Sequence, residues 1–140
     1  MLGDLEVKMD SILTQRELVE QRLKQPDDMG EMAWVFKVVS AAVVDGDTFD
    51  AVLDLGFGVW KKERFRLLRC NAPERGQPGW EAATDALIMA TKWESETYLW
   101  SRKTKRDKYG RYLADVWFIA RQKWLSDIML ASGLVEEYLP

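Results

Sequence analysis

The feature that most constrains the fold is a row of three β-rich runs in the first half of the chain. The runs span residues 34–44, 48–55 and 60–69. Asp45-Gly46-Asp47 and Gly56-Phe57-Gly58 separate them, and glycine in such short polar or glycine-rich stretches is a strong turn signal. In the second run apolar residues recur at every other position, which is the period of a strand with one buried face. The pattern predicts three strands joined by tight turns.

The rest of the chain alternates between helical and β-like patterns. A Gly- and Pro-containing stretch at 76–79 precedes the first predicted helix. The predicted elements are a helix over 80–93, strands over 97–103 and 111–119, and a helix over 122–131. Three meandering strands close naturally with two more into a barrel, because closure removes exposed strand edges. We therefore expect an α+β fold, a five-stranded OB-fold barrel with helices.

Residues 1–31 differ in character from the rest of the chain. Apolar positions between residues 4 and 25 follow a three-four spacing, which predicts an amphipathic helical extension. Pro26-Asp27-Asp28-Met29-Gly30 predicts a stop and a linker, so we expect the barrel domain to span residues 32–140. The apolar stripe must be buried, either on its own domain or against another chain. Self-association through this helix is the second of these alternatives.

Several functions are excluded or disfavoured by composition. The chain has no histidine and one cysteine, which excludes a Ser-His-Asp triad, a Cys-His pair and zinc held by histidine or thiolates. A metal would therefore sit among oxygen ligands, which favours calcium or magnesium. No apolar run reaches the ~20 residues that cross a membrane, and the first residues carry acids where a signal peptide carries bases. With a single cysteine, these features predict a cytoplasmic protein without a membrane partner.

Charge is distributed unevenly around a net value of −3. Residues 1–31 hold eight acidic against four basic side chains, whereas residues 61–111 hold thirteen Lys and Arg against seven Asp and Glu. Because a phosphate responds to the local potential, the basic centre is suited to DNA or RNA. The alternative is an ordinary solvated charged face.

Hydrolysis of a phosphodiester needs a base for water, an in-line grip on the phosphoryl group and positive charge for its oxygens. A carboxylate can act as base, a divalent metal as clamp and arginines as two-pronged phosphate ligands. The chain offers such groups at Asp47, Arg66, Glu74 and Arg111. Pro73 restricts the backbone that aims Glu74.

Three blocks carry a family resemblance. They are Val44-Asp45-Gly46-Asp47-Thr48, then Phe65-Arg66-Leu67-Leu68 with Ala72-Pro73-Glu74, and Asp107-Lys108-Tyr109-Gly110-Arg111. In this order they resemble the staphylococcal-nuclease (thermonuclease) family, over about residues 32–138. The resemblance implies an OB-fold endonuclease that cuts DNA and RNA with little sequence preference and leaves 3′-phosphate ends.

The resemblance also implies roles for individual residues. Glu74 would be the general base, and Arg66 and Arg111 would grip the scissile phosphate. Lys108 and Tyr109 would contact a neighbouring phosphate. These roles are expectations that follow from the resemblance.

The residues expected to bind a metal differ from the family pattern at one position. Asp47 would bind calcium, or another divalent cation, with the main-chain carbonyl of Ala72, but Asn71 stands where the family usually carries a second aspartate. An amide oxygen brings no charge, and calcium affinity depends on the charge of its ligands. Three outcomes stay open: weak but sufficient binding, compensation by an acid such as Asp45, or a catalytically inactive nucleic-acid- or protein-binding module. Retention of Glu74 and both arginines favours an enzyme.

Aromatic side chains have two possible roles, in the core or on a nucleic-acid base. Tyr138 could stack on a base or cover the core, and Trp80 is the tryptophan expected nearest the substrate. The tryptophans within helix or strand patterns are expected in the core: Trp34, Trp93, Trp100 and Trp117.

Overall fold

The fold was taken from a computed structural model, which describes residues 33–92, 96–103 and 108–138. The helical extension and linker predicted for residues 1–31 lie outside the described residues, as do Trp93 and Asp107. Within the described part, none of the helices is long and apolar enough to cross a membrane.

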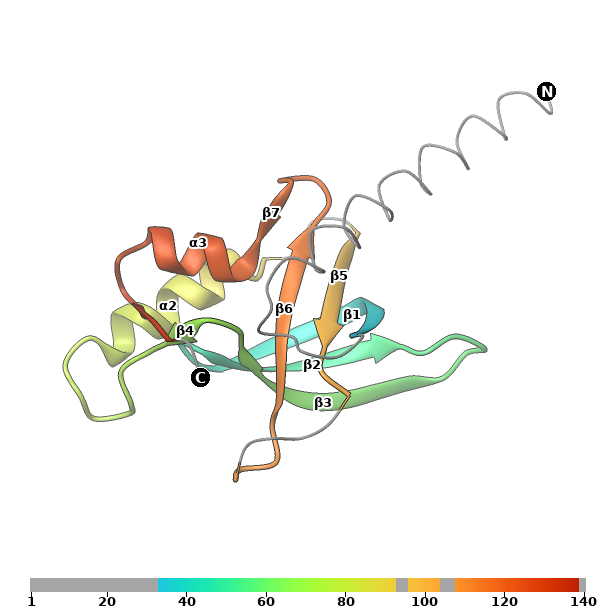
Figure 1. The fold of residues 1–140 in the computed structure, drawn as a ribbon, viewed down its shortest axis with the longest axis horizontal. Helices are drawn as coiled ribbons and strands as arrows, with labels where there is room; N and C mark the ends of the chain where they lie inside the picture. Colours follow the sequence, from blue (N-terminus) through green and yellow to red (C-terminus); the bar gives the residue numbers. More distant parts are fainter. Residues whose placement is uncertain (1–32, 93–95, 104–107, 139–140) are drawn as a thin grey trace. The chain divides into compact units, whose positions relative to one another are not determined.

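Five strands form a closed barrel (Figure 1). They are β1 (Trp34–Asp45), β2 (Thr48–Asp54), β3 (Trp60–Leu67), β5 (Thr97–Ser101) and β6 (Tyr112–Phe118). The first three form an antiparallel meander, β5 pairs antiparallel with both β1 and β6, and β6 closes the barrel by pairing parallel with β3. The α+β fold with a five-stranded OB-like barrel, predicted from the sequence, is confirmed.

Two helices and three short strands complete the described part. They are α2 (Trp80–Ala90), α3 (Leu125–Ala131), β4 (Cys70–Asn71), β7 (Lys123–Trp124) and β8 (Glu136–Glu137). Strand β7 pairs with β6, and β8 pairs with β4. Figure 1 shows α2, α3 and β4 gathered at one end of the barrel, whereas the β2–β3 hairpin extends away from them. We call these the helix end and the open end.

The short strands and the exact helix bounds were not predicted. Helix α3 begins at Leu125 rather than at Gln122, because Gln122 adopts a left-handed backbone with φ of 54° and strand β7 follows it. Helix α2 ends at Ala90, three residues before the predicted end.

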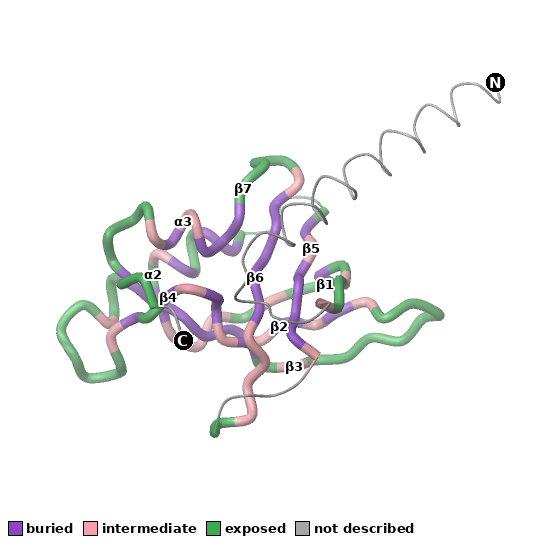
Figure 2. The backbone as a smooth tube through the Cα atoms, viewed as in Figure 1, coloured by how far each residue is buried: buried purple, intermediate pink, exposed green. Residues whose placement is uncertain are grey.

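The core fills the barrel and continues beneath the helices (Figure 2). Phe49, Ala51 and Leu53 of β2 are buried, as their alternation predicted. Phe65 and Leu67 of β3 meet them from the neighbouring strand, where Phe49 is paired with Phe65. Burial of these side chains is the main stabilising contribution to a barrel of this size.

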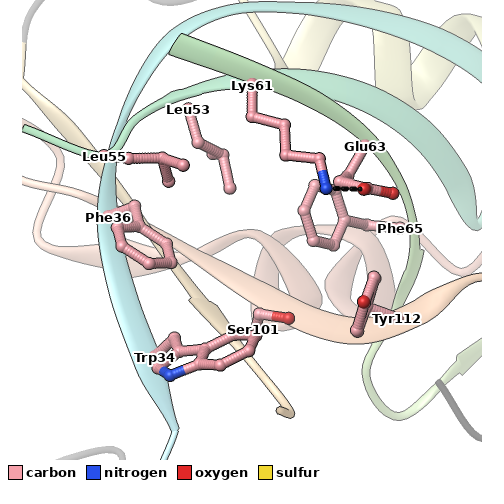
Figure 3. A pocket seen from close by; sticks show the side chains of 9 residues that line it. All are labelled: Trp34, Phe36, Leu53, Leu55, Lys61, Glu63, Phe65, Ser101 and Tyr112. Atoms are coloured by element: carbon pink, nitrogen blue, oxygen red, sulfur yellow. Dashed lines mark ion pairs between the residues drawn. The ribbon is translucent and has the colours of Figure 1, made fainter. Parts of the chain in front are cut away.

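The open end holds a mostly apolar cavity of about 310 Å³ (Figure 3). Trp34, Phe36, Leu53 and Tyr112 line it, with a Lys61–Glu63 ion pair at 2.9 Å on its wall. The expectation that Trp34 lies in the core was wrong: its side chain is 44% exposed, because β1 begins at the rim of the barrel. Two other tryptophans expected in the core are buried there, Trp100 and Trp117.

Candidate active site

Gly46 brings the turn between β1 and β2 into close contact with the helix end. A Cβ atom on Gly46 would lie 2.7 Å from the Cβ of Ala83 in α2 and 2.9 Å from the Cβ of Ala72. Such contacts are far inside normal packing distance, so only glycine allows this approach. The turn that carries Asp47 is therefore fixed against α2 and against the segment that follows β4.

Asp47 is buried, with 8% of its surface exposed. Its Oδ2 accepts a hydrogen bond of 2.9 Å from the backbone N–H of Ala72, and its Oδ1 accepts one of 2.9 Å from the Thr48 hydroxyl. A buried carboxylate needs such partners to offset its lost hydration. The contacts orient Asp47 beside Ala72, the residue expected to share a cation with it.

Arg66 contacts this carboxylate directly, and Arg111 reaches it through Thr48. Arg66 of β3 places Nη2 3.8 Å from Asp47 Oδ2 and donates a hydrogen bond of 3.1 Å to Asn71 Oδ1. Arg111, just before β6, donates a hydrogen bond of 2.9 Å from Nη1 to Thr48 Oγ1. The hydroxyl of Thr48 thus links Arg111 to Asp47. Sequence analysis missed this bridging role, although Thr48 lies in the first signature block.

Aromatic rings lie against both arginines. The guanidinium carbon of Arg66 is 5.0 Å from the centre of the Tyr138 ring, and that of Arg111 is 5.1 Å from the centre of the Tyr109 ring. Lys108 Nζ is also 5.1 Å from the Tyr109 ring. Cation–π contacts of this kind help to hold the cations in place. Both rings remain partly exposed and are accessible at the edge of the site.

Glu74 lies on an ordered turn beside this network. Its backbone N–H donates to Gln77 Oε1 at 2.9 Å, and the Gln77 N–H donates to the Glu74 carbonyl at 2.9 Å. The side chain is exposed, and among the described residues no hydrogen bond or ion pair joins it to Asp47, Arg66 or Arg111. Gln77, which sequence analysis did not single out, fixes the backbone that carries Glu74.

Asp45 and Trp80 are partners of each other. The indole N–H of Trp80 donates a hydrogen bond of 2.8 Å to Asp45 Oδ1, and the Arg75 guanidinium lies 5.0 Å from the Trp80 ring. Asp45, the acid considered as a compensating ligand, is therefore already engaged at the start of α2.

Cys70 has no nucleophilic character in this fold. It is completely buried, and burial raises the pKa of its thiol to about 12. The thiol therefore stays protonated at neutral pH.

The family model of staphylococcal nuclease homologues matches residues 64–139. The chain belongs to this family. The match includes Arg66, Glu74 and Arg111, whereas Asp47 precedes it and is joined to the site by the contacts described above. No curated protein matches the sequence significantly. Family membership and barrel fold together make the chain a nuclease-like or nucleic-acid-binding module.

Proposed function

We propose that this staphylococcal-nuclease-like domain hydrolyses phosphodiester bonds of DNA, RNA or both, with little sequence preference and with 3′-phosphate products. The observation that carries the proposal is the arrangement of Arg66 and Arg111 around Asp47 and Thr48. Two guanidinium groups, one on β3 and one just before the neighbouring strand β6, suit one phosphoryl group, whose oxygens gain charge during the reaction.

In this proposal the arginines bind and neutralise the scissile phosphate. Arg66 is held by Asn71 and Tyr138, and Arg111 is held by Thr48 and Tyr109. Because their positions are set before substrate arrives, little reorganisation is needed when the transition state forms. In the same proposal, Lys108 and Tyr109 contact the next phosphate along the strand.

Glu74 takes the proton of the attacking water. Its side chain is exposed on a turn that Gln77 holds in shape, so water can reach it. A carboxylate can act as a general base when it lies within hydrogen-bond reach of the water in the bound complex. Pro73 and Gln77 restrict the backbone on both sides of this group.

The donors around Asp47 fit a calcium ion in kind but supply little charge. The Asp47 carboxylate, the Asn71 amide oxygen and the Ala72 carbonyl are all oxygen donors, which calcium prefers. In the described part of the chain, no three His, Cys, Asp or Glu side chains form a metal-binding group. One carboxylate with neutral oxygens therefore favours weak binding. When bound, the cation supplies positive charge to the phosphate oxygens.

A second candidate function is nucleic-acid binding without turnover. It is favoured by Asn71, which brings no charge and already accepts a hydrogen bond from Arg66. In such a module the arginines would bind phosphate as they do in the enzyme, and Glu74 would have no role.

The proposal is tested by incubating the full chain with labelled single-stranded DNA and RNA across a calcium titration. We expect hydrolysis by the wild type, a large loss in Glu74→Gln, and activity at lower calcium in Asn71→Asp, which adds a charged ligand. If the wild type, Glu74→Gln and Asn71→Asp all leave both nucleic acids intact yet bind them in a salt-sensitive manner, the binding module is the correct function.

A further inference from the structure

Strand β3 presents different side chains on its two faces. Lys61, Glu63 and Phe65 line the cavity inside the open end of the barrel (Figure 3). Because successive side chains of a strand point to opposite faces, the residues between them point outward. We call this set the outer track; its members are Trp60, Lys62, Arg64 and Arg66.

The outer track starts at the candidate active site and ends at the tip of the β2–β3 hairpin. The pairing of β2 with β3 runs without a bulge from Thr48 opposite Arg66 to Asp54 opposite Trp60, so the alternation holds along the whole track. At a rise of about 3.4 Å per residue, the six steps from Arg66 to Trp60 cover about 20 Å. The track is thus long enough to meet several nucleotides beyond the scissile bond.

A further cation, Arg111, lies just before the neighbouring strand β6. Phe65 of β3 pairs with Tyr112 of β6, and one residue before this pair stand Arg64 and Arg111. Tyr112 lines the inner cavity, so Arg111 lies on the outer side with Arg64. Arg111 and the outer track therefore face the same side of the barrel.

Carboxylates of β2 and of the turn before it partly neutralise the track. Asp50 of β2 receives hydrogen bonds of 2.7 and 3.1 Å from Arg64 and lies 3.9 Å from Lys62. The Arg64 hydrogen bond lowers the pKa of the Asp50 carboxyl, so this negative charge is present at neutral pH. Asp54 also stands opposite Trp60, and Asp47 lies 3.8 Å from Arg66, so carboxylates accompany the whole track. Lys62 and Arg64 are nevertheless far more exposed than Asp50, with 67% and 52% of their side chains exposed against 14%, so positive groups face solvent in the middle of the track.

Trp60 gives the far end of the track an exposed aromatic surface. Its side chain is 64% exposed, far more than those of Trp100 and Trp117 in the same barrel. A tryptophan at the end of a row of cations is the combination that binds unpaired nucleotides, because cations meet phosphates and the ring stacks on a base. In a duplex that base face is already covered by its neighbours.

We propose that the outer track binds a single-stranded segment of nucleic acid, with phosphates along Arg66, Arg64 and Lys62 and one base stacked on Trp60. This inference rests on the proposed function for the position of the scissile phosphate at Arg66, and it makes a single strand the preferred substrate. A segment of this length is at the short end of the about 4–16 nucleotides that one OB fold engages.

The test measures binding rather than turnover, in the full chain carrying Glu74→Gln. Fluorescence anisotropy follows a labelled oligothymidylate of about 12 nucleotides and a duplex of the same length. Trp60→Ala is expected to weaken single-strand binding by about five-fold to about 100-fold, Trp60→Phe to retain most of it, and the duplex to respond to neither change. Circular dichroism and thermal unfolding verify that each variant is folded.

Lys61 supplies a matched control for Lys62. The two neighbours carry the same charge, but Lys61 pairs with Glu63 on the inner face. Lys62→Ala is expected to reduce the salt dependence of log K by about 0.7, the value for one phosphate contact on a single strand, and Lys61→Ala to leave it unchanged. Equal effects of the two substitutions would mean that the track is only part of a diffuse positive field, and would overturn the proposal.

Asp50 allows a test that predicts a gain. Asp50→Asn removes the negative charge between Arg64 and Lys62 and should tighten single-strand binding by about two-fold or more, with a steeper salt dependence. Unchanged or weaker binding by the folded variant contradicts the track. These experiments measure binding and not hydrolysis. If the wild type proves inactive, the proposed function is wrong, but the binding results still test the track. If the wild type hydrolyses nucleic acid but substitutions at Trp60 and Lys62 leave binding unchanged, the proposed track is wrong and the proposed function still stands.

Discussion

The two ends of the barrel differ in how their side chains are packed and bonded. At the helix end, polar groups are buried and bonded: Asp47 accepts two hydrogen bonds, and Gly46 allows the turn to pack directly on α2. At the open end, apolar side chains surround a cavity, and Trp34 and Trp60 remain largely exposed. The tightly packed helix end should tolerate few substitutions, whereas the open end should tolerate more.

This difference indicates where side-chain positions must be fixed most precisely. A carboxylate and two arginines attract one another and must be kept apart by a fixed backbone for a phosphate to enter between them. The open end has no such requirement, since an apolar cavity and an exposed ring act through surface area. Substitutions at the helix end should therefore change both activity and stability, and those at the open end should change mainly binding.

The largest expected effect is at Arg66. Arg66→Ala removes one of the two guanidinium groups proposed to bind the phosphate and should lower kcat by about 10²- to 10³-fold, the usual loss for one transition-state donor. Arg66→Lys keeps the charge but not the two-pronged geometry and should recover only part of the activity. Trp34→Ala at the open end is the control and should retain wild-type turnover. Equal losses at both positions would contradict the separation of the two ends.

The next effect concerns pH and the buried carboxyl of Asp115 under α3. It accepts hydrogen bonds from the N–H groups of Val116 and Ser126 and from the Ser126 hydroxyl, but burial still raises its pKa to about 6. An aspartate in the unfolded chain titrates near 3.9, so between about pH 4 and 6 the folded state holds more proton. The free energy of unfolding therefore falls as pH rises through this window.

Asp115→Asn removes this titration. The wild type should lose roughly 2 kcal/mol between pH 4 and pH 7 from this group, and the variant should lack that loss. Urea unfolding at a series of pH values measures the slope, which matters more than the absolute stability because asparagine cannot accept all three hydrogen bonds. Parallel pH profiles for the two proteins would show that the carboxyl is already ionised at low pH.

A smaller loss of stability is expected from Gly46→Ala. The added methyl must displace Ala83 or Ala72, and overpacking of this kind costs about 1–3 kcal/mol. Leu55→Ala, at a position 38% exposed beside the open end, should cost less. In Gly46→Ala/Ala83→Gly the nearest clash is removed, so part of the loss should return. Chemical denaturation of the three variants gives the comparison.

Most of the barrel was predictable because its strands alternate regularly and end at glycine turns. The pattern placed β2 and β3, since Phe49, Ala51 and Phe65 have to face inward. Strands of two residues, such as β4 and β8, carry no periodic signal and exist only because tertiary pairing brings them together. The same holds for Gln77, whose hydrogen bond to the Glu74 backbone depends on the shape of one turn.

The sequence named three residues that the structure brings close together, but it did not reveal how they are connected. The signature blocks named Asp47, Arg66 and Arg111, yet no spacing rule indicates that the Thr48 hydroxyl would join two of them. The partnership of Asp45 with Trp80 likewise spans 35 positions, so it follows from the fold alone. Contacts between distant positions depend on the closed barrel and could not be derived before it was known.

The smallest expected effect compares one ion pair from each end. Arg69 donates to Asp127 in the first turn of α3, whereas Lys61 pairs with Glu63 on the wall of the open end. Exposed ion pairs contribute about 0–1 kcal/mol, and the Arg69 pair is the better held because Arg69 also donates to Ser126. Asp127→Asn should therefore lower stability by a few tenths to about 1 kcal/mol, and Glu63→Gln by less. High salt should shrink both losses, because partly exposed pairs are screened. A larger loss from Glu63→Gln would show that the open end is as tightly constrained as the site, and the contrast between the two ends would have to be abandoned.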